Sequence, residues 1–110
     1  MPKDNNLTKL IEILSIGIIQ VLNIPDIVDK EESEFFFRTI SYNVKRLRIA
    51  KSMSQLEVAL CIGQKSSGFY ANTENYKHGK HFNLLHLFKL SKLFGVEMAE
   101  FFKPIDSQYS

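Results

Sequence analysis

The chain has 110 residues, of which 45% are hydrophobic and 24% are charged. This length suits one small helical domain with an extension, and the hydrophobic fraction excludes an intrinsically disordered chain. The single cysteine, Cys61, excludes an internal disulfide and indicates a reducing, cytoplasmic environment. We interpret Cys61 as a small buried hydrophobic residue.

The formal net charge of +2 conceals an uneven distribution. Residues 1–34 hold three lysines and seven acids, a net charge of −4. Residues 35–92 hold ten Lys and Arg but only two acids, a net charge of +8, and residues 93–110 have a net charge of −2. Clustered Lys and Arg are typical of proteins that bind nucleic-acid phosphates. A basic helical surface without a partner is the alternative.

The chain begins with an apolar segment, from Leu7 to Ile24, that predicts a helix. One stripe at helical spacing holds Leu7, Leu10, Ile11, Leu14, Ile18, Val21 and Leu22. The uninterrupted apolar run is about 12 residues, short of the roughly 18 that a membrane span needs. A secretory signal is disfavoured because positive charge and a small-residue cleavage site are lacking. We expect this stripe to be buried in a homodimer, or else against its own domain.

Pro25 predicts the end of this helix, and the acidic segment from Asp26 to Glu34 predicts a linker with a short helical turn. An alternative role for these acids is to shield the basic surface when DNA is absent. We therefore divide the chain into a dimerisation element and linker (residues 1–34), a helical domain (residues 35–104) and a tail (residues 105–110).

The segment from Phe35 to Lys51 predicts the first helix of the domain. Its core stripe holds Phe36, Ile40, Val44 and Leu47. Its basic residues supply two candidates for phosphate contacts, Arg48 and Lys51, although any solvated helix carries similar charges.

The segment from Ser54 to Tyr70 predicts a helix, a tight turn and a second helix. Ser54 and Glu57 have the spacing of a capping box, and the apolar residues that follow predict a largely buried helix. Gly63 suits a chain reversal because it can adopt a positive φ. Gln64 to Ser67 would then open a polar second helix, in which Gly68 is unfavourable by roughly 1 kcal/mol relative to alanine.

Four segments together resemble the helix-turn-helix domain of the phage-repressor (Cro/cI, XRE) family. Asn43 to Arg48 is similar to its first helix and Met53 to Ala59 to its second, while Leu84 to Val96 and Met98 to Phe102 are similar to its fourth and fifth. The chain is one residue longer than the family pattern between Gly63 and Glu74. The resemblance implies an all-α fold, a five-helix phage-repressor-like domain with an additional N-terminal apolar helix.

The resemblance also implies roles for residues around the turn. The residue matching Gln55 binds a backbone phosphate, and those matching Gln64, Lys65, Ser66 and Ser67 contact base edges. Either Phe69 or Tyr70 is a core residue and the other faces DNA, and we include Tyr70 among the base-contacting candidates. Further candidate phosphate contacts follow at Asn75, Lys77 and Lys80, in or next to a basic loop.

Other chemistry lacks support in the sequence. His78 and His81 have no adjacent Cys or carboxylate to complete a metal site, and no catalytic motif is present. We expect no metal, no cofactor, no small-molecule substrate, no membrane partner and no enzymatic activity.

Two hypotheses follow. The first is a homodimeric transcriptional regulator, most simply a repressor, that binds double-stranded DNA. The second is an adaptor or antitoxin-type protein that uses the helical fold and the N-terminal helix to bind another protein.

Overall fold

The computed structural model describes residues 6–15 and 25–105, and all regular structure in these ranges is helical. A helix at residues 6–15 is followed by α2 (Lys30–Ala50), α3 (Gln55–Cys61), α4 (Ser67–Glu74), η1 (Lys77–Gly79), α5 (Leu84–Phe94) and η2 (Met98–Phe102). The predicted all-α class is confirmed. The segment predicted as a fifth helix is a 3₁₀ helix, η2.

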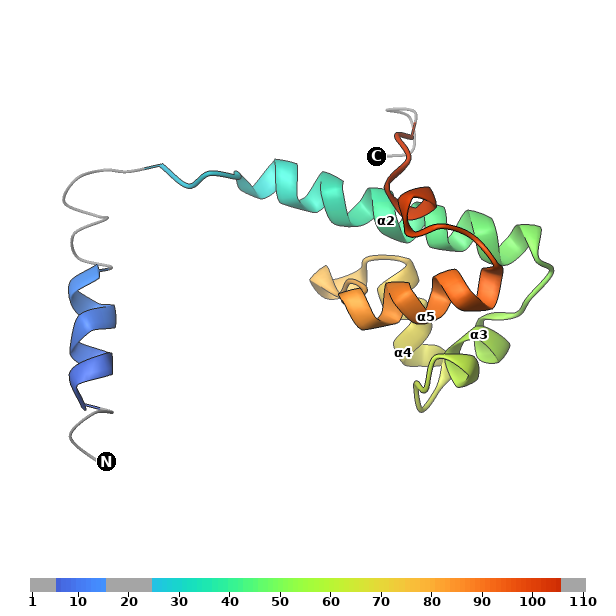
Figure 1. The fold of residues 1–110 in the computed structure, drawn as a ribbon, viewed down its shortest axis with the longest axis horizontal. Helices are drawn as coiled ribbons and strands as arrows, with labels where there is room; N and C mark the ends of the chain where they lie inside the picture. The colour runs from blue at the N-terminus through green and yellow to red at the C-terminus, as the bar shows by residue number, and fades with distance from the viewer. Residues whose placement is uncertain (1–5, 16–24, 106–110) are drawn as a thin grey trace.

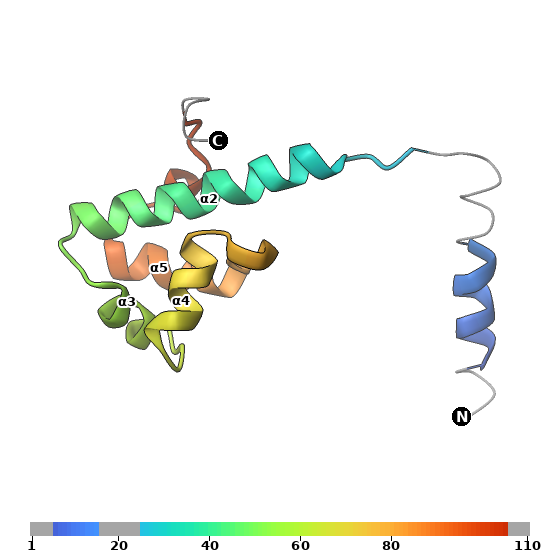
Figure 2. The same cartoon turned by 180° about the vertical axis from the view of Figure 1, so that it is seen from behind.

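The longest helix, α2, lies along one side of the shorter helices (Figures 1 and 2). It contacts α4, α5 and η2, while α3 packs on α4. The short helix η2 closes the core between α2 and α5. In both views α3 and α4 lie side by side.

Helix α2 begins earlier than predicted. The Asp29 side chain accepts a hydrogen bond of 2.8 Å from the Glu32 amide, and two glutamates occupy the first turn. Both features stabilise a helix N-terminus. Residues 30–34, predicted as part of the linker, therefore form the first turn of α2, while the predicted domain boundary after residue 34 stays a prediction.

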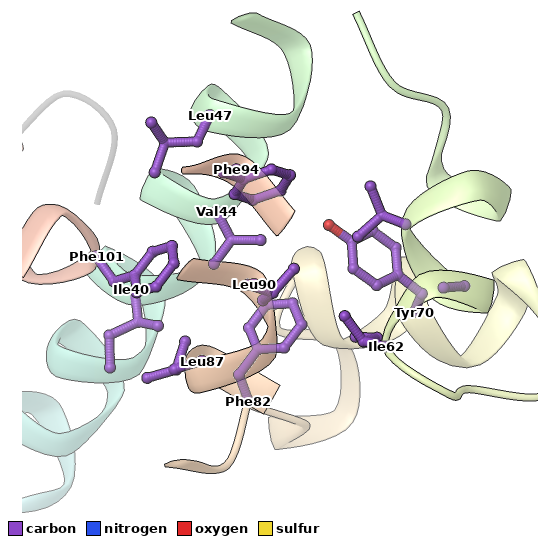
Figure 3. Close-up of a cluster of buried hydrophobic side chains, with 12 residues drawn as sticks. Ile40, Val44, Leu47, Ile62, Tyr70, Phe82, Leu87, Leu90, Phe94 and Phe101 are labelled. Atoms are coloured by element: carbon purple, nitrogen blue, oxygen red, sulfur yellow. The ribbon is translucent and has the colours of Figure 1, made fainter. Parts of the chain in front are cut away.

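The core is a single cluster to which every helix from α2 onward except η1 contributes (Figure 3). Its buried members are Ile40, Val44, Leu47, Val58, Ala59, Ile62, Tyr70, Phe82, Leu87, Leu90, Phe94 and Phe101. Asn43 joins α2 to the end of η2, because its Nδ2 donates to the carbonyl oxygens of Phe101 (3.0 Å) and Lys103 (2.9 Å). These contacts pair polar groups that would otherwise be buried unsatisfied.

Local signals at the helix ends are confirmed. Ser54 and Glu57 form the predicted capping box, with both hydrogen bonds at 3.0 Å. Gly63 adopts the predicted positive φ, 82°, after α3. Helix α5 has ends of the same kinds, because Asn83 caps its start and Gly95 ends it with a φ of 66°.

Several apolar side chains are more exposed than predicted. Helix α3 has only seven residues and faces the core with Val58 and Ala59 alone. Phe36, Leu56, Leu60 and Cys61 are exposed, although they were expected to be buried. On α5, Leu84 and Phe88 are also exposed, and the buried side chains begin at Leu87.

The helix at residues 6–15 exposes its apolar stripe. Leu7, Leu10, Ile11 and Leu14 are each more than half exposed. The remaining predicted dimer contacts, at Ile18, Val21 and Leu22, lie outside the described residues. Dimerisation through this stripe stays a prediction.

We predict that His86 makes stability pH-dependent. Its Nδ1 accepts a hydrogen bond from the Asn83 amide (3.3 Å), and partial burial, followed by the nearby Lys89 charge, lowers the pKa of His86. Because the folded state binds this proton more weakly, the contribution to stability is complete above about pH 6.5 and is lost as the pH falls below it. His86→Gln keeps a capping side chain.

Urea unfolding of wild type and His86→Gln from about pH 7 to pH 5 measures this effect. We expect the free energy of unfolding to fall more steeply for wild type. Parallel curves would show that His86 does not contribute.

Candidate nucleic-acid interface

The turn between α3 and α4 is fixed by backbone hydrogen bonds. The Gly63 amide donates to the Leu60 carbonyl oxygen (3.2 Å), and the Gln64 amide donates to that of Ala59 (2.8 Å). Ser66 caps α4, with its Oγ accepting from the Phe69 amide at 3.4 Å. Helix α4 therefore begins at Ser67. Gln64 and Lys65 were predicted to open this helix, but they lie in the turn before it.

A buried ion pair fixes α4 against α2. The Arg48 guanidinium donates from Nε and Nη2 to the two carboxylate oxygens of Glu74, both at 2.9 Å. Its Nη1 donates to the Met53 carbonyl oxygen (2.8 Å), and Gln55 Nε2 donates to Glu74 Oε1 (3.3 Å). The Arg48 side chain is 12% exposed and that of Glu74 is fully buried. The pKa of Arg48 is raised, chiefly by its hydrogen bonds to Glu74.

Two predicted DNA contacts are corrected by this arrangement. Arg48 is engaged by Glu74 inside the domain and is not available to a phosphate. Tyr70 is fully buried, so it is the core aromatic of α4 and not a base-contacting residue. Figure 3 shows its ring among the core side chains. Burial, and then the Glu74 carboxylate, raise the pKa of the Tyr70 hydroxyl far above its usual range.

The opposite side of α4 faces solvent. Gly68 and Phe69 are exposed in its first turn, Ser67 and Asn72 are half-buried, and Lys65 is exposed in the turn before it. The Gln64 Oε1 is buried and has no hydrogen-bond partner among the described residues. Its amide oxygen is thus not presented to solvent, while the predicted base contact of the Gln64 side chain stays a prediction.

The remaining phosphate candidates surround α4. Lys51, Lys77 and Lys80 are exposed. Gln55 uses its side-chain amide on Glu74, and Asn75 donates from Nδ2 to the Ala71 carbonyl oxygen at 2.9 Å. Phosphate contacts by these five residues remain predictions, whereas the one predicted for Arg48 is corrected above.

The loop after α4 is more structured than its composition suggests. Tyr76 and His78 have left-handed backbone conformations, which turn the chain sharply. The His81 ring stacks on Phe37 with centroids 3.8 Å apart, and the Arg38 guanidinium lies 4.9 Å from the Tyr76 ring centroid. Within the described residues, no group of three or more His, Cys, Asp or Glu could hold a metal ion.

Sequence reasoning missed the role of Glu74, although a signal existed. Only two acids lie in the basic region from residue 35 to residue 92, and the capping box accounts for Glu57. Glu74 is thus the one acid of this region without a capping role, which made it a candidate for pairing with one of the ten cations there. Of the two aromatic residues considered for the core of this helix, Tyr70 is the buried one, and Phe69 is therefore exposed.

The chain matches no protein-family model, no curated protein and no solved structure. Neither residues 6–15 nor residues 25–105 contain a helix with the length and apolar character needed to cross a membrane. Resemblance to the phage-repressor family therefore stays a prediction, based on the residues quoted above.

We predict that Glu74→Gln destabilises the domain by about 3 kcal/mol, because it leaves the Arg48 guanidinium buried without its counter-charge. Urea unfolding at neutral pH measures the change. Glu57→Gln is the matched control, since Glu57 is exposed and glutamine retains the capping box. Equal stability of the two variants would contradict a structural role for the buried pair.

Proposed function

We propose that this protein is a sequence-specific regulator of transcription that binds double-stranded DNA as a homodimer, most simply as a repressor in the cytoplasm. The observation that carries the proposal is how α4 is held in the domain. One side is fixed by the Arg48–Glu74 pair and by Tyr70, while the first turn is exposed on the other side. A short helix held in this way, behind a tight turn, is suited to entering the major groove.

The charge distribution supports the same proposal. Arg48 and Glu74 neutralise one another in the interior. The other nine Lys and Arg of residues 35–92 are all exposed, and Glu57 is the single acid remaining in that range. An excess of exposed positive charge of this kind favours binding to nucleic-acid phosphates.

A dimer would place two copies of α4 in successive major grooves, about 34 Å apart on one face of the duplex. The exposed stripe at residues 6–15 is the candidate contact between the copies. Its leucines and isoleucine are unfavourable in water and would be covered by a second copy of the stripe.

A second candidate function is binding of another protein, as an adaptor or antitoxin-type partner. Exposed apolar side chains favour it: Leu56, Leu60, Leu84, Leu85 and Phe88. Apolar docking of this kind changes little with salt, whereas binding to several phosphates weakens steeply as salt rises.

Selection of bound duplexes from a random pool, at about 0.15 M salt, tests the two functions. We expect enrichment of a two-fold symmetric site. Weak, salt-sensitive binding without an enriched sequence would contradict the proposal and favour the protein-binding function.

We predict that Lys65→Gln reduces the magnitude of the slope of log affinity against log salt by about 1 per protomer, because the exposed Lys65 ammonium, in the turn before α4, would release one phosphate counterion on binding. Lys30→Gln is the control, since that lysine is exposed at the start of α2. Titrations of the selected site at several salt concentrations measure both slopes. A slope unchanged by Lys65→Gln would remove Lys65 from the interface.

A further inference from the structure

We propose that Phe69 and Lys80 form one composite DNA contact, in which the Phe69 ring packs on the 5-methyl group of a thymine and the Lys80 ammonium binds an adjacent phosphate. This inference rests on the proposed function and names the base that part of the site selects.

Phe69 does not belong to the buried core. It is 55% exposed in the first turn of α4, whereas the next residue, Tyr70, is fully buried and supplies the aromatic side chain of the core. The Phe69 backbone is fixed nevertheless, because its amide donates to the Ser66 cap. The ring is therefore presented to solvent from the capped first turn of α4, where it can contact a partner.

Lys80 reaches this ring from another part of the chain. Its Nζ lies 5.2 Å from the ring centroid of Phe69, in cation–π geometry. The left-handed residues Tyr76 and His78 turn the chain after α4, and the Lys80 amide donates to the Lys77 carbonyl oxygen at 3.1 Å. An ammonium has three donors, so one resting on a ring face still has hydrogens directed outward for an anion.

The chemistry of the two side chains selects the partner. A phenyl ring has neither a donor nor an acceptor, so it cannot recognise the hydrogen-bonding pattern of a base. Thymine alone among the four bases presents a methyl group in the major groove, and apolar contact with this group is a known mode of recognition. Lysine beside it supplies a charge for the phosphate and holds the ring in place.

The chain contains a second pair of the same kind, which serves as an internal control. On α5, Phe88 is 53% exposed and the Lys92 Nζ lies 5.4 Å from its ring centroid. The two pairs match in exposure and in geometry. They differ in place, because Phe88 lies on the outer side of α5 and not in the first turn of α4.

The test uses the full chain and a duplex selected from the random pool, with each thymine replaced in turn by deoxyuridine. This replacement removes only the 5-methyl group and leaves base pairing unchanged. At one position in each half-site, we expect wild-type affinity to fall about fourfold, as for loss of one buried methyl group. Phe69→Ala should bind the thymine and deoxyuridine duplexes equally, whereas Phe88→Ala should retain the fourfold difference.

Two further measurements make the result decisive. Lys80→Gln should lower the salt slope by about 1 per protomer, while Lys92→Gln should not. Urea unfolding should show that Phe69→Ala is as stable as wild type, since the ring is outside the core.

Each outcome has one consequence. If specific DNA binding persists but Phe69→Ala remains as sensitive to deoxyuridine as wild type, the thymine contact is wrong and the proposed function stands. If no thymine is sensitive in wild type, the contact is likewise wrong. If the wild type selects no duplex, both proposals are wrong.

Discussion

The position of α4 depends on one buried ion pair. Arg48 comes from the last turn of α2, and its guanidinium binds both oxygens of Glu74 at the end of α4. Bonds to the Met53 carbonyl and from Gln55 bring the start of α3 into the same network. Removing these charges from water is costly, but bidentate geometry tolerates little misalignment. The main effect of the pair is therefore to fix the relative orientation and position of α2, α3 and α4.

Once α4 is fixed in this way, its rotation determines which side chains reach a ligand. Tyr70, Thr73 and Glu74 face inward at helical spacing. Phe69, one residue before Tyr70, is consequently exposed, together with Gly68. The same arrangement removes Arg48 and Glu74 from the surface charge. The composition of the exposed side of α4 is thus a consequence of packing on its other side.

Local features were predictable from the sequence, and long-range ones were not. The cap at Asn83 and the helix end at Gly95 depend on short segments, so their residues suffice to identify them. The helix beginning at Lys30 was missed because acidic residues are typical both of linkers and of helix N-termini. Arg48 and Tyr70 were misassigned because a sequence shows which residues are charged or aromatic, but not which distant residue lies opposite them.

The exposed N-terminal stripe is best understood from what the core already contains. Within the described residues, the twelve buried apolar side chains run from Ile40 to Phe101, and they form one cluster closed by η2. The helix at residues 6–15 is not needed to complete that cluster, yet Leu7, Leu10, Ile11 and Leu14 remain exposed. Side chains that a domain does not need for folding, and that water disfavours, are available for contact with another chain. The DNA-binding hypothesis uses this helix as the dimer contact and the protein-binding hypothesis uses it to bind a partner, so its exposed stripe does not by itself distinguish between them.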